Sequence, residues 1–180
     1  NEPLIPLLMA VGRLHPMKDY PLLMEAIARV RLIRPVRLII LGEGPQRSDL
    51  EALKERLGLS ECIALLGFVE NPVAYLKAAR LLVVSSRWEG FSNVVVEALL
   101  VGTPVVSTDC GGPREVLRDG LYGRLVPVND PEQLAGALLN ALDESPNREA
   151  LIQRAHDFDL DQVMEAYERV CWGPKDPQGS

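Results

Sequence analysis

Short, continuously apolar runs alternate along the chain with longer segments whose apolar residues recur at helical spacing. Such runs are typical of strands buried on both faces of a parallel sheet, because strands with one wet face alternate polar and apolar residues. The pattern predicts strands at residues 7–11, 36–41, 62–66, 81–85, 105–107 and 123–126. It predicts helices at residues 20–33, 46–57, 72–79, 94–101, 113–117, 131–142, 147–155 and 160–171. We therefore expect an α/β domain built on a doubly wound parallel sheet.

The composition agrees with a single globular domain. The chain has 180 residues, enough to bury a core, and its 47% hydrophobic and 24% charged residues are ordinary for globular proteins. A net charge of −6 argues against generic binding to nucleic acid or anionic membranes, although it leaves room for a local basic patch. Cys62, Cys110 and Cys171 are widely spaced and form no metal-binding pattern, which favours a reducing, cytoplasmic location.

The ends of the chain indicate a piece of a longer protein. No apolar run is long enough to span a bilayer, and no signal peptide is present. The chain starts almost directly on an apolar strand and without methionine. Residues 173–180 are rich in glycine, proline and polar residues, and we expect a flexible tail there.

The least ordinary residue choices lie between Arg87 and Pro104. Ser92 and Asn93 are good N-cap residues for the apolar helix that follows, and Glu97 is the one charge inside that helix. The helix is apolar on nearly every face, so we expect Glu97 to be buried and to need a partner.

Glu89 lies eight positions upstream of Glu97, in the loop before the helix. A helix N-terminus with free N–H groups favours an anion, so this stretch predicts an anion site with one carboxylate beside it and a second a turn inside. A core helix with one satisfied glutamate and an ordinary capped loop is the alternative.

Two cations, Arg13 and Lys18, follow the first strand. Ligands of doubly wound sheets bind at the carboxyl ends of the strands, so this loop and the Glu89 loop should open on the same edge. Arginine as a planar fork and lysine as a point charge suit a diphosphate, although a solvated basic loop is the alternative. His15, between them, is expected to be simply exposed.

Other loops carry weaker patterns. The loop at 67–71 either faces a flat ring or is a plain turn, and the glycine-rich loop at 108–113 either approaches a ligand or is a tight turn, which we prefer. The sequence has neither a dinucleotide fingerprint nor a phosphate-binding loop of the GxxxxGK[ST] type. The acidic residues of the last segment match calcium-loop spacing superficially but lack the required glycine, and we interpret the aspartates as helix caps. They are Asp157, Asp159, Asp161 and Glu168.

Together these segments resemble the C-terminal, donor-binding domain of the retaining GT-B glycosyltransferases, specifically the GT4 family called glycosyl transferases group 1. The matching segments are VGRLHPMKD, LGEGPQRSDLE, LLGFVENP, SSRWEGFSNVVVEALLVGTPVVSTDCGGPREVL and DGLYGRLVPVNDPEQLA. The most specific parts are the E-x7-E pair of Glu89 and Glu97 and the G-R-x4-K pattern of Gly12, Arg13 and Lys18. The resemblance implies a Rossmann-like sheet that forms the C-terminal half of a GT-B fold.

The resemblance also implies roles for these residues. Arg13 and Lys18 would hold the pyrophosphate of a nucleotide-diphosphate sugar and neutralise the leaving group, a device that suits developing charge. Glu97 would bind the ribose hydroxyls, and Glu89 would hold the transferred sugar and face the reacting side. We expect retention of anomeric configuration, without a covalent intermediate on Glu89.

Backbone and apolar groups would complete the donor site. Val69 and its neighbours would face the base, for which uridine is our expectation. The backbone of the loop and first helical turn would line the sugar and phosphate, at Gly90, Phe91, Ser92, Asn93 and Val94. No metal or other cofactor is expected, because protein cations and a helix end take the place of a metal ion.

One departure from the family is serious, because its enzymes have two such domains and the N-terminal, acceptor-binding domain is absent here. We expect residues 1–172 to be a donor domain that transfers little or no sugar alone. The expected partners are the nucleotide sugar and the absent domain, not nucleic acid. A peripheral association of the whole enzyme with the inner face of the membrane stays open. The alternatives are a non-catalytic nucleotide-sugar-binding module and a related GT-B epimerase or phosphorylase.

Overall fold

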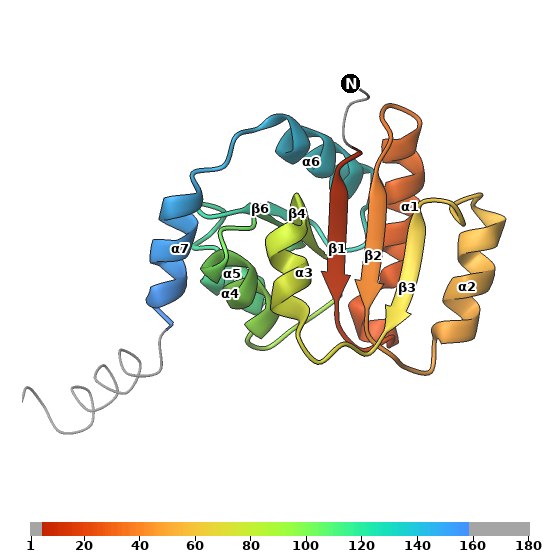
Figure 1. Ribbon diagram of the computed structural model, residues 1–180, viewed down its shortest axis with the longest axis horizontal. Helices are drawn as coiled ribbons and strands as arrows, with labels where there is room; N and C mark the ends of the chain where they lie inside the picture. The colour runs from red at the N-terminus through yellow and green to blue at the C-terminus, as the bar shows by residue number, and fades with distance from the viewer. Residues whose placement is uncertain (1–4, 159–180) are drawn as a thin grey trace, which may run out of the picture.

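The computed structural model describes residues 5–158, in which six parallel strands form one sheet in the order β3-β2-β1-β4-β5-β6 (Figure 1). Each strand pairs in parallel with its neighbours. The strands are β1 (Leu7–Val11), β2 (Arg37–Leu41), β3 (Ile63–Gly67), β4 (Leu81–Val84), β5 (Val105–Thr108) and β6 (Arg124–Val126). The doubly wound, Rossmann-like sheet predicted from the sequence is confirmed.

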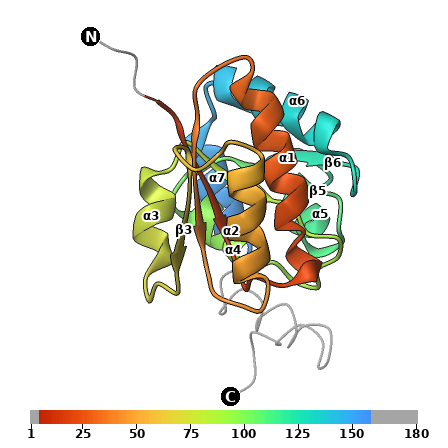
Figure 2. The same cartoon turned by 90° about the vertical axis from the view of Figure 1, so that its right-hand side faces the viewer.

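Helices cover both faces of the sheet, as the edge-on view shows (Figure 2). One face carries α1 (Tyr20–Arg31), α2 (Arg47–Arg56) and α6 (Pro131–Asp143). The other carries α3 (Pro72–Ala78), α4 (Asn93–Leu100), α5 (Gly112–Val116) and α7 (Arg148–His156). A short 3-10 helix, η1 (Pro16–Lys18), precedes α1.

The two cores follow from the pleat of the strands. Leu8 and Ala10 of β1 pack into the first core, whereas Met9 between them packs into the second. Successive side chains of a strand point to opposite faces, so a strand covered on both sides must be apolar at every position. This is the physical reason for the continuously apolar runs in the sequence.

The predicted elements match the observed ones to within about two residues, the usual uncertainty at element ends. The largest difference is at α1, predicted to reach Ile33 but ending at Arg31. Leu32 caps the helix, and its side chain and that of Ile33 are exposed on the turn that follows. The helix predicted at 160–171 and the tail at 173–180 lie outside the described residues. No helix within residues 5–158 is long and apolar enough to cross a membrane.

The sheet order places two charged loops side by side. β1 lies between β2 and β4, so the loop leaving β1 and the loop leaving β4 meet at the carboxyl edge, where the direction of winding reverses. This is the place where doubly wound sheets bind ligands.

Candidate nucleotide-binding site

The loop after β1 folds back on itself before α1 begins. His15 caps η1, and its Nδ1 accepts a hydrogen bond from the Met17 backbone N–H at 3.3 Å. Asp19 then adopts a left-handed conformation with φ of 47°, which turns the chain into α1. The side chain of Lys18 therefore leaves from a structured turn rather than from an open loop.

Side chains of the loop after β4 tie the two loops together. The Ser85 hydroxyl donates to the carbonyl oxygen of Lys18 at 2.7 Å. Arg87 donates twice, from its backbone N–H to the Met17 carbonyl and from Nε to the Asp19 carboxylate, both at 2.8 Å. The positions of the two loops are thus set relative to each other by direct bonds.

The two loops bring Lys18 and Glu89 together in an ion pair. The Glu89 carboxylate oxygen that accepts from Lys18 Nζ also accepts from the buried Ser86 hydroxyl at 2.7 Å. The Lys18 side chain is 18% exposed and that of Glu89 only 7%. The sequence placed both residues at one edge, but the direct pairing is a finding of the structure.

The surroundings of Glu89 favour its ionised form. Burial opposes ionisation, but the hydrogen bonds from Lys18 and Ser86 outweigh it and hold the pKa of Glu89 below its ordinary value. The Ser92 hydroxyl also favours the carboxylate, but it does not reach hydrogen-bonding geometry. Glu89 is therefore a negative charge at neutral pH.

A third loop, after β5, closes the site from the other side. The Glu89 backbone N–H donates to the Cys110 carbonyl at 2.7 Å, and the Gly112 N–H donates to the Glu89 carbonyl at 3.0 Å. A Cβ at Gly112 would lie 1.4 Å from the Gly90 carbonyl oxygen, so only glycine fits. Residues 108–113 therefore do more than form the tight turn that we preferred as an interpretation. Their backbone, which we call the backbone clamp, also holds Glu89 in position.

The prediction that Glu97 is buried is wrong. Only three residues of α4 are buried, Val95, Ala98 and Leu99, and Glu97 is half-buried. Its carboxylate forms no ion pair or hydrogen bond with any residue of the described chain. The reason is tertiary: α4 packs one face on the sheet and leaves another accessible, although its sequence is apolar almost throughout.

The N-terminus of α4 has free hydrogen-bond donors. Ser92 occupies the predicted N-cap position, but its side chain makes no capping bond, and its hydroxyl is buried without a partner among residues 5–158. No described residue accepts a bond from the backbone N–H of Asn93 or Val94. Buried polar groups are usually paired, so this end of the helix is suited to an anionic, hydroxyl-bearing ligand.

Gly12 and Arg13 form the opposite wall. A Cβ at Gly12 would lie 2.8 Å from Lys18 Cε, so the glycine leaves the space that the lysine side chain crosses. Beneath it, the buried Tyr20 hydroxyl donates to the Gly12 carbonyl at 3.0 Å, and burial, with the negative charge of Glu89, raises the pKa of this phenol. Arg13 is exposed and forms no ion pair within the described chain.

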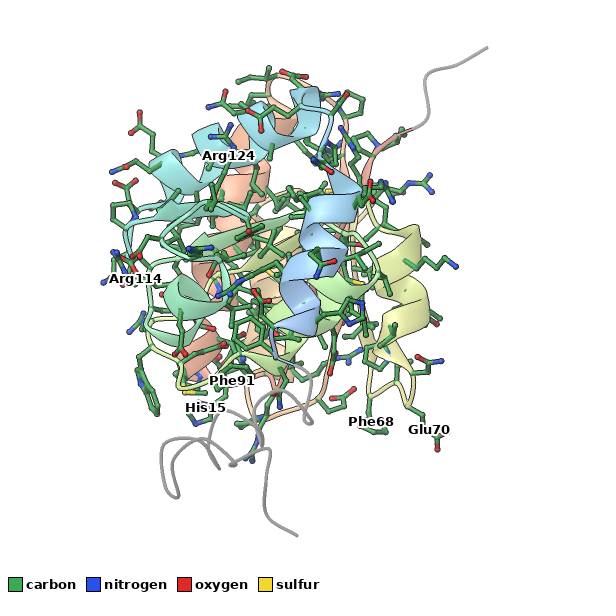
Figure 3. The ribbon with its side chains drawn as sticks, turned by 90° about the vertical axis from the view of Figure 1, so that its left-hand side faces the viewer. His15, Phe68, Glu70, Phe91, Arg114 and Arg124 are labelled. Atoms are coloured by element: carbon green, nitrogen blue, oxygen red, sulfur yellow. The ribbon has the colours of Figure 1, made fainter. Side chains whose placement is uncertain are left out.

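The remaining predicted residues lie along the same edge. Val69 is half-buried against the second core, and Gly90 and Phe91 are on the Glu89 loop, with Phe91 53% exposed. His15 and Phe91 lie at this end of the molecule, with Phe68 and Glu70 farther along it (Figure 3). The predicted site residues thus lie in the loops that leave β1, β3 and β4 and at the start of α4, with Glu97 a turn inside this helix, and neither Glu97 nor Arg13 forms an ion pair within residues 5–158.

Sequence reasoning missed three polar side chains of this site: Tyr20, Ser86 and Thr108. The Thr108 hydroxyl donates to the Ser86 carbonyl at 2.6 Å and so supports the residue that holds Glu89. The available signal was the run of serines and a threonine directly after β4 and at the end of β5, polar residues at buried strand ends.

No group of three or more histidine, cysteine, aspartate or glutamate side chains within residues 5–158 is arranged to hold a metal ion. Of the acidic residues with calcium-loop spacing, only Asp157 is described. It is the C-cap residue of α7, and its carboxylate pairs with Arg154 at 2.8 Å. Asp159, Asp161 and Glu168 lie outside the described residues.

Comparison with known proteins gives relatives over most of the chain. The family model described as glycosyl transferases group 1 matches residues 5–158. The lipopolysaccharide core biosynthesis glycosyltransferase LpsE of Rhizobium meliloti (strain 1021) is 34% identical over 167 residues, which cover 90% of this chain and 48% of the relative.

A second relative comes from Campylobacter jejuni: the N-acetylgalactosamine-N,N'-diacetylbacillosaminyl-diphospho-undecaprenol 4-alpha-N-acetylgalactosaminyltransferase. It is 37% identical over 149 residues, which cover 82% of this chain and 40% of the relative. The chain thus spans about half the length, or less, of these curated relatives.

Solved structures agree on the fold. The lipopolysaccharide outer core galactosyltransferase WaaB superimposes with a TM-score of 0.85 at 22% identity, over 93% of this chain and 49% of that one. Anabaena Alr3699/HepE in complex with UDP superimposes with a TM-score of 0.75 at 25% identity, over 91% of this chain and 44% of that one.

The sheet, the loops at its switch point and these superpositions define the chain as a Rossmann-like half of the GT-B glycosyltransferase fold. The family match over residues 5–158 identifies the family, and the chain belongs to the glycosyl transferases group 1.

Proposed function

We propose that this chain is the donor-binding domain of a retaining glycosyltransferase and that it binds a nucleotide-diphosphate sugar at the carboxyl edge of its sheet. The observation that carries the proposal is the meeting of Lys18, Glu89 and the open N-terminus of α4 at the switch point. A nucleotide-diphosphate sugar has a diphosphate between two hydroxyl-rich sugars. The cation and the free N–H groups of this site suit the diphosphate, and the carboxylates on either side suit the sugar hydroxyls.

Lys18 would bind the diphosphate without abandoning Glu89. A lysine ammonium has three donors, and Glu89 takes one of them. Pairing with a carboxylate also stops the side chain from sampling other positions, so less entropy is lost when the ligand binds. When the glycosidic bond breaks, negative charge grows on the diphosphate, and Lys18 and Arg13 would stabilise it electrostatically.

The two carboxylates would have different partners. Glu89, oriented by Lys18 and Ser86, would accept hydrogen bonds from hydroxyls of the transferred sugar. Glu97 would accept from the ribose hydroxyls, and the absence of a partner for its carboxylate within residues 5–158 supports this role. The backbone of Gly90 to Val94 would line the sugar and phosphate, and the half-buried Val69 would contact the base.

A uridine nucleotide is our proposal for the donor, because HepE, which is 25% identical to this chain over the aligned region, was solved in complex with UDP. The proposal extends to residues 1–172 as the donor domain, with a partner domain that binds the acceptor. The length of the relatives supports such a partner domain. The isolated chain is expected to transfer little or no sugar, and transfer to be metal-independent.

Calorimetric titration of the 180-residue chain with UDP, GDP and ADP tests the proposal. We expect one nucleotide, UDP, to bind best, and Lys18→Ala and Glu97→Ala each to weaken it about ten- to a hundredfold, the value of a charge-assisted hydrogen bond. Lys54→Ala, which breaks an ion pair with Glu51 on α2, is the control and should bind UDP as the parent does. Equal affinity for all nucleotides in the parent and in both site variants would contradict the proposal.

A further inference from the structure

At the opposite end of the sheet, the turn that joins α1 to β2 carries two aliphatic side chains that the fold leaves in solvent. Leu32 is 88% exposed and Ile33 is 71% exposed. Their backbone is held, because the N–H groups of Leu32 and Ile33 donate to the Arg29 and Val30 carbonyls at 3.2 and 3.0 Å. The turn projects at the top of Figures 1 and 2, at the end away from the strand arrowheads.

Three arginines flank this pair in the sequence. Arg31 and Arg37 are exposed, with Arg31 Nη1 donating to the Cys62 sulfur at 3.4 Å, and Arg34 is half-buried and pairs with Asp143 at 2.6 Å. We call Arg31 to Arg34 together with Arg37 the basic tip.

A hollow of about 450 Å³ beside the tip extends the positive surface. Its lining includes four cationic side chains: Arg34, Lys77, Arg80 and Arg148. Among the acidic side chains near this edge, Asp143 is paired with Arg34 and Glu144 with Arg124, Glu61 lines a neighbouring hollow together with Arg37, and Glu149 follows Arg148 in the first turn of α7. This edge is therefore basic in a chain whose net charge is −6.

We propose that the basic tip docks on the surface of an anionic lipid bilayer. Leu32 and Ile33 would enter the interface between headgroups and acyl chains, and the arginines would contact lipid phosphates. Arginine suits this position because its apolar stem packs along buried surface while its charged end stays in water.

The shape and chemistry of the tip favour a bilayer over a protein partner. Protein interfaces are enriched in aromatic anchors, whereas the tip is convex and presents two aliphatic residues between cations. Of the exposed aromatic residues of the described chain, Phe68, Trp88 and Phe91 lie on loops at the carboxyl edge, and Tyr75 lies on α3. Docking through the tip would leave that edge free, so the inference does not depend on the proposed function.

Co-sedimentation of the 180-residue chain with vesicles tests the inference. We expect binding to vesicles of equal parts phosphatidylcholine and phosphatidylglycerol, little binding to phosphatidylcholine alone, and weaker binding as salt is raised. The double variant Leu32→Ser with Ile33→Ser should bind the anionic vesicles at least about tenfold more weakly. Arg31→Gln with Arg37→Gln should weaken binding by a similar factor, since each cation near the surface adds about fivefold.

Matched controls test whether vesicle binding depends on the basic tip or on any exposed apolar or cationic side chain. Phe68→Ser removes an apolar side chain that is 78% exposed at the opposite edge, and Arg118→Gln removes an exposed cation that is not part of the tip. Both should bind vesicles as the parent does. Circular dichroism melting should show every variant folded, because the substituted side chains are exposed.

A reporter at the tip gives a second, independent readout. Ile33→Trp should show a blue shift of its fluorescence on anionic vesicles, and Phe68→Trp should not. Failure of the parent to bind anionic vesicles would overturn the inference, as would equal binding by the parent and the double Ser variant. Self-association in light scattering that the double Ser variant abolishes, without vesicle binding, would also overturn it and would assign the tip to a contact between copies.

Discussion

The two ends of this sheet depart from the ordinary rules of folding in opposite ways. At the carboxyl edge, polar groups are buried: Ser86 and Ser92 are nearly inaccessible, and the charged side chain of Glu89 is 7% exposed. At the amino edge, apolar groups are exposed, with Leu32 and Ile33 in solvent between arginines.

Each departure costs free energy and indicates a different kind of partner. A buried carboxylate is stable only when hydrogen bonds and opposite charge compensate for its lost hydration, and Lys18 and Ser86 supply both to Glu89. Exposed leucine and isoleucine do not gain the free energy of burial, because their side chains keep unfavourable contact with water until something covers them. The first edge is preorganised for a polar ligand, and the second offers an apolar contact to a surface.

The largest loss of stability is expected when the backbone contact between the Glu89 loop and Gly112 at the carboxyl edge is disrupted. In Gly112→Ala the new Cβ would meet the Gly90 carbonyl at 1.4 Å, a contact that backbone atoms cannot relieve by a rotamer change. We expect a loss of stability above about 4 kcal/mol, or failure to fold, measured by urea denaturation. The control Gly136→Ala lies in helix α6 with nothing within 4 Å of its Cβ and should gain about 0.5–1 kcal/mol. Similar stability of the two variants would show that the clamp does not hold the site.

Breaking the ion pair should have the next largest effect. Lys18→Ala leaves Glu89 buried without its cation, and we expect a loss of about 3 kcal/mol at neutral pH, the lower end of what breaking a buried pair costs, because Lys18 keeps 18% exposure. In the control Lys54→Ala on α2, the carboxylate left behind, Glu51, is 36% exposed and still pairs with Arg47, so this variant should lose less than about 1 kcal/mol in the same denaturation experiment.

The Lys18–Glu89 ion pair also predicts how the stability of the fold changes with pH. The pKa of Glu89 is lower in the folded chain than its ordinary value of about 4.3. Its stabilising contribution is therefore fully present above the ordinary pKa and is lost as pH falls through the lowered one. The stability gap between the parent and Lys18→Ala should narrow in acid, and a gap that is constant from neutral pH to pH below that range would contradict the role given to Lys18.

A smaller effect is expected from the residue beneath the first loop. Tyr20→Phe removes the hydrogen bond to the Gly12 carbonyl while keeping the ring, and should cost about 1 kcal/mol. Nucleotide binding should weaken by no more than about threefold, because the Tyr20 hydroxyl supports the loop after β1 from below and does not itself contact the nucleotide. Calorimetry of Tyr20→Phe beside Lys18→Ala measures the difference, and a loss as large as that of Lys18→Ala would place Tyr20 in direct contact with the ligand.

The smallest effect on stability is expected at the amino edge. Leu32→Ser replaces a side chain that is 88% exposed and should change the free energy of unfolding by less than about 0.5 kcal/mol. Ile27→Ser, on the buried face of the same helix, is the comparison and should destabilise strongly. A large loss from Leu32→Ser would mean that this side chain supports the fold.

Local pattern was enough to predict most elements of this fold. The run Leu7 to Val11 is a strand with the predicted bounds, because a strand buried on both faces leaves a signature independent of its neighbours. The α1 boundary was harder, since Leu32 and Ile33 continue the apolar pattern past the last helical residue. Hydrophobicity alone does not distinguish a residue that faces the core from one on an exposed turn.

Within the candidate site, residue types and strand-end positions identified Lys18 and Glu89, whereas their mutual contact depended on strand order. The error at Glu97 has the same origin. An apolar helix suggests burial on every side, but how much of α4 is covered depends on how its neighbours pack, and Glu97 lies on a half-covered side. Ser86 and Thr108 were missed because their importance comes from bonds between loops of different strands.

The alternation of strands and helices, the two-sided burial of the sheet and the chemical groups at each strand end could all be predicted from the amino-acid sequence. These properties depend on residues that are near one another along the chain, such as the apolar run of β4. Which loops meet, the pairing of Lys18 with Glu89 and the exposure of individual side chains became known only from the folded structure. Those outcomes depend on contacts between residues far apart in the chain, 71 positions for Lys18 and Glu89, which no local pattern encodes.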